Sequence, residues 1–319
     1  MEIIDFNKEM APQAQELLWN CYLEERAHAA ALPEEPRIPP LEGLAQNGLG
    51  VAAVEDGKLL GFLGAYGPWK PVFCTPDVSG VFSPLHAHAV QREDRVRLWR
   101  RLYQAAAEKW AQAGAASHAI TLFAHDCGAR EALYMYGFGV RCLDMMRPMK
   151  GIAAGGGWTC SELPHARHGE LTPLRRELAA HLAQSPSFMH HEPEQLEAWL
   201  RRKAGAGSRV FVAERNGRIA AYIEADGEGE NFLTGASGTA NICGAYCLPA
   251  YRGMGAAQAA LNAMISALKD EGYVRLGVDC ESMNPTALGF WSKYFDIYTH
   301  SVVRRIDENA VLYRVQGGI

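Results

Sequence analysis

The residues with the clearest chemistry lie in the segment 252–258, which follows a proline turn and opens a predicted helix. The first amides of a helix have no acceptor within the helix and lie at the positive end of its dipole. Glycine has no Cβ, so an anion can approach the main chain closely. We therefore expect a phosphate site formed by Arg252, Gly253, Met254, Gly255, Ala256, Ala257 and Gln258.

Two neighbouring elements must hold this site in place. An extended segment from Asn241 to Leu248 precedes it, and a helix from about Ala257 to Glu271 follows, with Gly272 as its stop. Apolar residues recur along this helix at i, i+3, i+4 and i+7, namely Leu261, Met264, Ile265 and Leu268. One face of the helix is thus predicted to pack on a sheet and to keep the loop rigid.

The loop resembles the acetyl-CoA pyrophosphate loop of the GCN5-related N-acetyltransferases (GNAT), Arg/Gln-x-x-Gly-x-Gly/Ala, with Arg252, Gly255 and Ala257 in its three places. The segment 284–293 is similar to the family's Asn-x-x-Ala-x-x-Phe-Tyr-x-Lys. The resemblance implies acetyl-CoA as co-substrate and direct attack by an amine. It also implies that Asn284 reaches the coenzyme and that the pantetheine arm pairs with Ala245, Tyr246 and Cys247.

One departure from the family pattern affects the proton transfers. Trp291 stands where the family often has the tyrosine that protonates the leaving thiolate, and an indole is a hydrogen-bond donor only. Tyr294, three residues further on, is the candidate acid, unless the thiolate leaves without one. Glu281 is the first candidate for the base, and the pair His190 and His191 is the other.

Composition excludes several other classes. A hydrophobic content of 48% with 21% charged residues is typical of globular domains. The net charge of −5 argues against a nucleic-acid partner. The eight cysteines show no CxxC spacing, and His86 and His88 have no third ligand nearby, so we expect no metal. Without a leader or an apolar run of about 18 residues, a cytoplasmic protein with no membrane contact is expected.

The order of predicted elements occurs twice along the chain. Gly114 and Gly272 lie 158 residues apart, as do Asp126 and Asn284. We therefore predict two tandem α/β (α+β) domains, each a mixed, mostly antiparallel sheet flanked by helices. Residues 1–150 form a degenerate GNAT-like copy, 151–164 a glycine-rich linker, and 165–319 the catalytic domain that binds acetyl-CoA.

The first copy offers an internal comparison. A shift of 158 residues sets Asp94 opposite Arg252, Arg97 opposite Gly255 and Trp99 opposite Ala257. A carboxylate repels a pyrophosphate and bulky side chains block its approach to the backbone. The first copy is therefore expected to keep the fold without binding the coenzyme, and to serve a structural or substrate-covering role.

Three further predictions concern local structure within the two domains. Residues 81–90 are expected to form one extended segment, residues 68–76 a proline-broken loop, and residues 285–294 a helix.

The sequence leaves four functions open. The first is transfer of an acetyl group to a small primary amine, and the second is an acyl-CoA-binding regulatory module without catalysis. A third is a protein acetyltransferase whose N-terminal half grips its target. A dinucleotide-binding protein fits less well, because its glycines follow an early strand. Neither the acceptor nor the oligomeric state can be read from the sequence.

Overall fold

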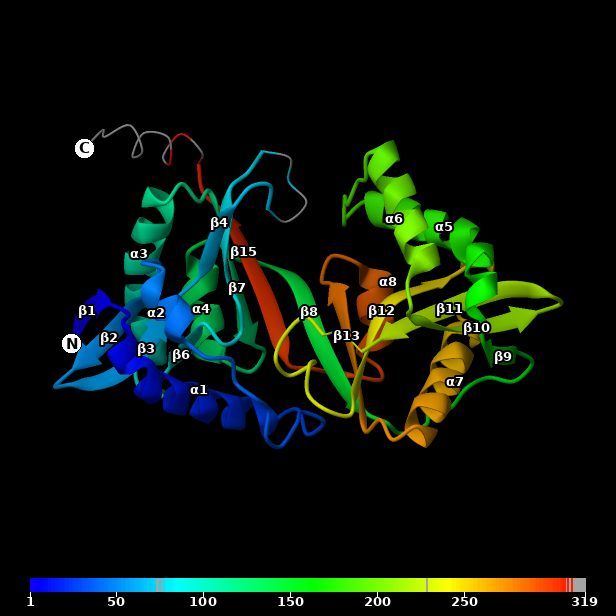
Figure 1. The fold of residues 1–319 in the computed structure, drawn as a ribbon, viewed down its shortest axis with the longest axis horizontal. Helices are drawn as coiled ribbons and strands as arrows, with labels where there is room; N and C mark the ends of the chain where they lie inside the picture. Colours follow the sequence, from blue (N-terminus) through cyan, green and yellow to red (C-terminus); the bar gives the residue numbers. More distant parts are fainter. Residues whose placement is uncertain (73–74, 76, 228, 308, 310, 312–319) are drawn as a thin grey trace. The chain divides into compact units, whose positions relative to one another are not determined.

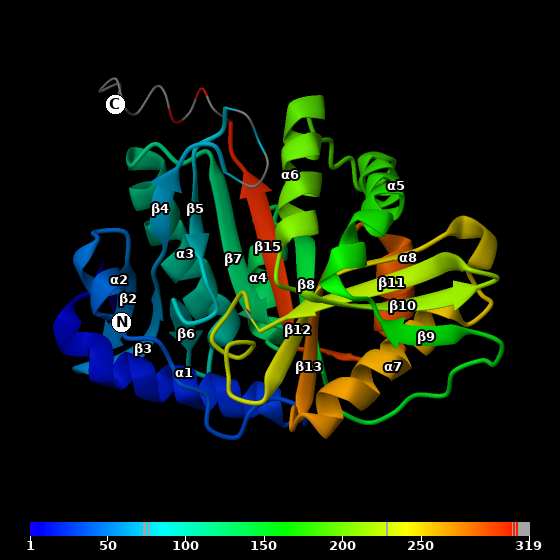
Figure 2. The same ribbon diagram turned by 45° about the vertical axis from the view of Figure 1, so that its right-hand side comes forward.

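The computed structural model describes residues 1–72, 75, 77–227, 229–307, 309 and 311 (Figures 1 and 2). The chain divides into two compact units. Unit 1 comprises Met1–Ala30, Glu34–Leu143 and the segment that begins at Ile297, and unit 2 comprises Ala31–Pro33 and Asp144–Asp296. Each unit has a mixed α/β architecture, as the sequence predicted.

Unit 1 contains two sheets. A four-stranded sheet has the antiparallel order β1-β2-β3-β6, and the strands β4-β5-β7-β15-β8 form the other. The elements of this unit are β1 (Glu2–Asp5), α1 (Ala11–Arg26), α2 (Glu42–Gln46), β2 (Val51–Glu55), β3 (Lys58–Leu63), β4 (Tyr66–Trp69), β5 (Gly80–Ser83), β6 (His88–Val90), α3 (Arg95–Gln112), β7 (Ser117–Phe123), α4 (Cys127–Met135), the first half of β8 (Gly139–Pro148) and β15 (Thr299–Arg305).

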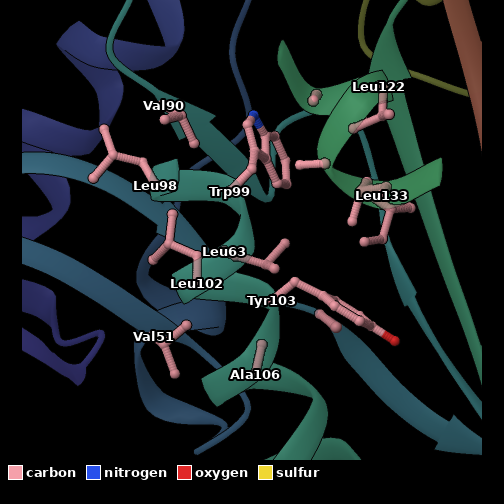
Figure 3. Close-up of a cluster of buried hydrophobic side chains, with 14 of the residues drawn as sticks. Val51, Leu63, Val90, Leu98, Trp99, Leu102, Tyr103, Ala106, Leu122 and Leu133 are labelled. Carbon is pink, nitrogen blue, oxygen red and sulfur yellow. The ribbon is translucent and has the colours of Figure 1, made fainter. Parts of the chain in front are cut away.

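The core of unit 1 surrounds α3. Figure 3 shows Leu98, Trp99 and Leu102 of this helix among side chains from the strands, Val51 and Val90 included. All five are at most 1% exposed. Burial of a large apolar side chain contributes about 1.5–3 kcal/mol, so the buried residues of α3 stabilise the fold of unit 1.

Unit 2 is built on one sheet with the order β8-β13-β12-β11-β10-β9. All pairs from β9 to β12 are antiparallel, and β12 pairs with β13 in parallel. The elements are the second half of β8, β9 (Thr159–Glu162), α5 (Thr172–Ala183), α6 (Pro193–Gly205), β10 (Arg209–Arg215), β11 (Arg218–Asp226), β12 (Thr239–Cys247), the short 3-10 helix η3 (Pro249–Tyr251), α7 (Ala256–Asp270), β13 (Arg275–Glu281), α8 (Pro285–Trp291) and β14 (Asp296–Ile297), where the unit ends.

Helix α7 packs against β10 and β11 through its predicted apolar face. Leu261, Met264, Ile265 and Leu268 are at most 2% exposed. Gly272 follows the helix with φ of +93°, a conformation that favours glycine. The helix that opens behind the phosphate loop is therefore rigidly supported.

Both predicted hairpins are present. Asp56 and Gly57 join β2 to β3 with φ of 50° and 77°, and Asn216 and Gly217 join β10 to β11 with φ of 53° and 72°. Two consecutive residues in the left-handed region are typical of the tight turns that match the twist of the flanking strands.

Three local predictions need correction. Residues 81–90 form two strands instead of one, because Pro84 starts a turn in which Ala87 N–H donates to its carbonyl. Part of the predicted loop 68–76 belongs to β4, an edge strand that tolerates proline; residues 73, 74 and 76 lie outside the described part. Helix α8 ends at Trp291, so Tyr294 lies in the turn after it.

The last strand of unit 1 comes from the far end of the sequence. β15 pairs with β7, and both belong to unit 1, whereas β8 leaves unit 1 after Leu143. The compact units thus divide at 143/144 and 296/297, whereas the sequence predicted a linker at residues 151–164. Sequence patterns specify a strand but not its partner, so the pairing of β15 leaves no signal along the chain.

Candidate functional site

The predicted phosphate loop forms the entry to α7. β12 ends at Cys247, η3 follows, and Gly253 and Gly255 have φ of +76° and +86°. Gly255 caps the helix and its carbonyl accepts from Ala259 N–H at 2.9 Å. This geometry leaves the first amides of α7 pointing outward at its positive end, as an anion site requires.

Arg252 is held beside the end of β12. Its Nε donates to the Cys247 carbonyl oxygen at 3.1 Å, and its guanidinium carbon lies 5.5 Å from the centre of the Tyr246 ring. These contacts place a permanent positive charge at the mouth of the loop, where it adds to the helix dipole.

The parallel strands β12 and β13 separate just before this loop. Their pairing runs from Thr239 opposite Arg275 to Ile242 opposite Val278, and the register continues no further in the described residues. A β-bulge between β11 and β12 falls at the same point, where Glu224 faces Gly244 and Ala225 faces Ile242. A bulge bends its strand, so it assists the separation.

The separation exposes main-chain groups of β12. Leu248 N–H donates to the Ala220 carbonyl oxygen at 2.9 Å, and antiparallel pairs alternate between bonded and non-bonded positions. Tyr246 therefore bonds toward β11, whereas Ala245 presents its N–H and C=O groups, and Cys247 its N–H group, on the β13 side; the Cys247 carbonyl accepts from Arg252. An extended ligand could pair with β12 there.

A pocket of about 430 Å³ occupies this opening in unit 2. Its lining comprises Leu178, His181, Tyr222, Ile223, Ala245, Tyr246, Cys247, Tyr251, Arg252, Gly253, Ala256, Ala257, Gln258, Asn284, Pro285, Thr286, Ala287, Gly289, Phe290, Trp291 and Lys293. The pocket thus brings together nine of the eleven predicted coenzyme residues. Met254 and Gly255 do not line it; they carry the turn behind it.

Asn284 lies opposite the loop and caps α8. Its Oδ1 accepts from Ala287 N–H at 3.2 Å and from the Thr286 hydroxyl at 3.1 Å. The side chain is 7% exposed. The predicted cap is therefore present, and its Nδ2 group is free of these two bonds because both use the oxygen.

The linker supports the loop from outside. Trp158 Nε1 donates to the Met254 carbonyl oxygen at 3.0 Å, and the Arg215 guanidinium lies 4.1 Å from the centre of the indole. A Cβ on Gly255 would lie 3.4 Å from the Gly155 backbone. This contact joins residues 96 apart, so no local pattern in the sequence predicts it.

The two predicted catalytic residues lie outside the pocket lining. Glu281 is the last residue of β13, and the ring centre of Tyr294 lies 5.3 Å from that of Phe290, which does line the pocket. His191 stacks near Trp199 at 6.3 Å. The pocket also contains polar residues that were not predicted: His181, Tyr222, Tyr251, Thr286 and Lys293. Of these, Lys293 fills the lysine place of the family-like pattern in residues 284–293.

A second cavity of about 350 Å³ begins where the first pocket leaves β12. It is lined by Asp144, Asp226, Gly229, Glu230, Thr234, Asn241, Ile242, Cys243, Val278 and Asp279. Ile242 and Val278 are the last paired residues of the two strands, so this cavity lies at the apex of the opening.

The carboxyl groups of this cavity affect one another. The side chain of Asp279 is exposed to solvent through the cavity, yet protein atoms surround it on most sides. This burial, together with the charges of Glu230 and Asp144, raises the pKa of Asp279 to about 7. A cation bound in the cavity would relieve the repulsion.

The corresponding helix mouth of unit 1 is occupied by side chains. Asp94 caps α3 with φ of 55°, and Arg95 donates to both oxygens of Glu24 at 2.7 and 3.1 Å. The side chain of Arg95 also fills the space beside Gly128. An ion pair thus stands where unit 2 has its phosphate loop.

The two helices differ in length at their first turn. Helix α3 has 18 residues and α7 has 15, and the predicted shift of 158 residues brings their last residues into register, so the extra residues lie at the beginning of α3. The predicted pairs Asp94–Arg252, Arg97–Gly255 and Trp99–Ala257 stay predictions. Trp99 is a core residue, 1% exposed.

The open parallel strands and the helix-mouth loop define unit 2 as an acyltransferase fold of the GNAT type. Residues 175–296 match the model of the Acetyltransferase (GNAT) family. A search of curated proteins finds no match.

Solved structures are similar to this chain at low sequence identity. A GCN5-related N-acetyltransferase from Sphaerobacter thermophilus has a TM-score of 0.56 and 15% identity, with 95% of each chain covered. A conserved protein of unknown function from Staphylococcus epidermidis has a TM-score of 0.45 and 8% identity, covering 80% of this chain and 94% of its own. The first of these extends the likeness of fold over both units.

Within the described ranges, no helix is long and apolar enough to cross a membrane. The same residues contain no group of three or more His, Cys, Asp or Glu side chains placed to hold a metal ion.

Proposed function

We propose that the protein is an N-acetyltransferase that moves the acetyl group of acetyl-CoA to a primary amine by direct attack. The observation that supports it most is the opening between β12 and β13, which ends at a glycine helix mouth with Arg252 beside it. The diphosphate of the coenzyme would bind the amides around Gly255, and its extended arm would pair with Ala245 and Cys247.

The amide that polarises the thioester would be that of Cys247, which faces the opening. A main-chain donor at this position acts on the oxygen where negative charge develops, and in comparable sites one such donor contributes about 3 kcal/mol. Asn284, on the opposite wall, would hold the coenzyme's arm through its amide nitrogen. Acetyl-CoA supplies the activated acetyl group.

Direct attack is favoured over an acyl-cysteine. Burial raises the pKa of Cys247, and burial together with Glu224 raises the pKa of Cys243 to about 12. A thiol that stays protonated at neutral pH is a poor nucleophile. The amine would therefore attack the thioester itself.

The acidic cavity supports a cationic acceptor. It lies at the apex of the opening, and Asp144, Asp226, Glu230 and Asp279 line it. An ammonium group there would be attracted by these carboxyl groups, and an amine with a second positive charge would keep this attraction after losing one proton. Glu281 follows Asp279 along β13 and remains the proposed acceptor of that proton.

One experiment tests the enzyme against the binding module. Release of free thiol from acetyl-CoA would be measured with mono- and diamines, and binding of acetyl-CoA by calorimetry. We expect turnover that is faster with diamines. Tight binding without turnover for any amine would favour the acyl-CoA-binding module, an alternative that the buried Trp291, where the family often has its acid, keeps open.

Three expectations carry over as proposals. An intracellular location would give access to acetyl-CoA, and neither nucleic acid nor a membrane is proposed as a partner. A protein amine is a possible larger acceptor, and acetylation of a lysine peptide in the same thiol assay would support it.

A further inference from the structure

His181 lies in the last turn of α5, and its side chain lines the coenzyme pocket. Its Nε2 lies 3.2 Å from the Thr286 hydroxyl and 3.3 Å from Asn284 Oδ1. The imidazole of His181 thus connects the end of α5 to the start of α8. No sequence motif indicates a role for this histidine.

The surrounding hydrogen bonds suit both protonation states of the ring. With a proton on Nε2, the ring donates to Asn284 Oδ1 or to the Thr286 oxygen. Without it, the Thr286 hydroxyl turns from Asn284 and donates to Nε2, while Ala287 N–H still satisfies Asn284. The imidazole can therefore lose and regain a proton without leaving a buried polar atom unsatisfied.

The other polar side chains of the pocket are less suited to proton transfer. The Tyr246 hydroxyl donates to Glu177 at 3.3 Å, and burial raises its pKa. Arg252 keeps its charge at any relevant pH, and the Trp291 indole has no proton to give at neutral pH. Histidine is the residue type whose charge changes between pH 5 and 8.

We propose that His181, with Thr286 as its hydrogen-bond partner, gives the proton that the departing thiolate of coenzyme A takes up. This inference rests on the proposed function, because it needs the coenzyme in the first pocket. It assigns to His181 the role that the sequence assigned to Tyr294.

The step balances in atoms and charge. The amine nitrogen forms a bond to the acetyl carbon, the carbon–sulfur bond breaks, and its electron pair stays on sulfur. Sulfur takes the Nε2 proton of the imidazolium form of His181, which leaves a neutral ring with its proton on Nδ1. The new amide nitrogen loses one proton to Glu281, and solvent then returns a proton to Nε2 and removes one from Glu281. The products are the acetamide and the free thiol.

Other charged and titratable groups face the same pocket. Glu177 lies one turn earlier on α5, Arg252 lines the pocket from the phosphate loop, and Lys293 lines it from the turn after α8. The tyrosine hydroxyls of the same lining belong to Tyr222, Tyr246 and Tyr251. A fall of kcat at high pH is therefore assigned to His181 only if this fall disappears in His181→Gln.

The first test compares kcat in four proteins: the wild type, His181→Gln, Tyr294→Phe and His191→Gln. General acids contribute about 100- to 10,000-fold, and a thiolate is a good leaving group, so we expect a loss of about 100-fold in His181→Gln. The decline of kcat at high pH should vanish with it. Tyr294→Phe and His191→Gln should stay within about threefold of the wild type.

A second test needs no acceptor. Coenzyme A and desulfo-coenzyme A differ only in the thiol, so both should bind the pocket. The imidazole resonance of His181, identified by its absence in His181→Gln, should shift more with the thiol present. Equal shifts would overturn the proposal, as would a His181→Gln enzyme with full kcat and an intact high-pH limb.

The two failures are distinguishable. If neither coenzyme binds, the pocket assignment fails and the role of His181 falls with it. If both bind with equal shifts while the wild type transfers acetyl groups, only the role of His181 fails. A loss confined to Tyr294→Phe would return the proton to the tyrosine.

Discussion

Asp94 and Gly255 are the cap residues at the start of the two long helices, and both have a left-handed backbone, with φ of 55° and 86°. In unit 2 this residue is a glycine beside outward-facing amides. In unit 1 it is an aspartate, and Arg95 after it is engaged by Glu24. One helix mouth is thus open to an anion, and the other already holds charged side chains.

Gly255→Glu should abolish acetyl-CoA binding. The variant brings negative charge to the phosphate site and places a side chain against the Gly155 backbone, 3.4 Å from the new Cβ. A non-glycine residue at this φ also costs about 1–3 kcal/mol of stability. Gly272→Glu, at the other end of α7 with φ of +93° and open space, carries the same strain. Calorimetry should show lost binding for Gly255→Glu alone; retained affinity there would refute the site.

Trp158→Ala should weaken acetyl-CoA binding about fivefold while leaving kcat nearly unchanged. The indole holds the loop through its bond to the Met254 carbonyl, and a net hydrogen bond contributes about 1 kcal/mol. Titration calorimetry measures the change in Kd. Trp158→Phe keeps an aromatic ring beside Arg215 but loses the bond, so its Kd should be close to that of Trp158→Ala. Equal Kd in all three proteins would show that the linker does not support the loop.

Asp279→Asn should change stability in a pH-dependent way. Because the pKa of Asp279 is raised to about 7, the folded wild type holds a proton that the unfolded chain releases near its ordinary value of about 3.9. The wild type therefore loses stability from pH 4 to pH 7, and the variant is spared this loss. The urea midpoint of Asp279→Asn, relative to that of the wild type, should be higher at pH 8 than at pH 4.

The same variant should raise KM for a diamine more than for a monoamine, since it removes one carboxylate from the acceptor cavity. Asp270→Asn, an exposed residue at the end of α7, serves as the control for both measurements. An equal change in KM for the monoamine and the diamine would count against the acidic cavity as the acceptor site.

Glu224→Gln should destabilise unit 2 by about 3 kcal/mol. Glu224 and Arg175 are each 1% exposed and 3.1 Å apart, and Lys203 and Ser208 also donate to the carboxylate. Removing one partner leaves a buried guanidinium uncompensated, which costs about 3–5 kcal/mol. Glu162→Gln breaks a more exposed pair with Arg209 and should cost less than about 1 kcal/mol. Urea denaturation compares them; equal losses would contradict the buried-pair argument.

The elements with strong local signals were predictable from the sequence. The face of α7, the turn at Asn216-Gly217 and the cap at Asn284 each depend on neighbours along the chain, and all three are present. The loop glycines were found because their φ values require glycine.

The parts that depend on contacts distant in sequence were not predictable. His181 meets Thr286 across 105 residues, and Trp158 meets Met254 across 96. The acidic cavity collects Asp144 from β8 and Asp279 from β13. Periodicity along the chain carries no information on contacts between distant residues. The polar residues of the two cavities could therefore be grouped only once the fold was known.

The position of β15 has a consequence for how the chain can be cut. A fragment ending near residue 150 would lack the strand that lies between β7 and β8, and the remaining fragment would lack β8, the neighbour of β13. Each piece would expose an unpaired strand edge that invites aggregation. Neither piece is therefore expected to fold alone as well as it does in the full chain.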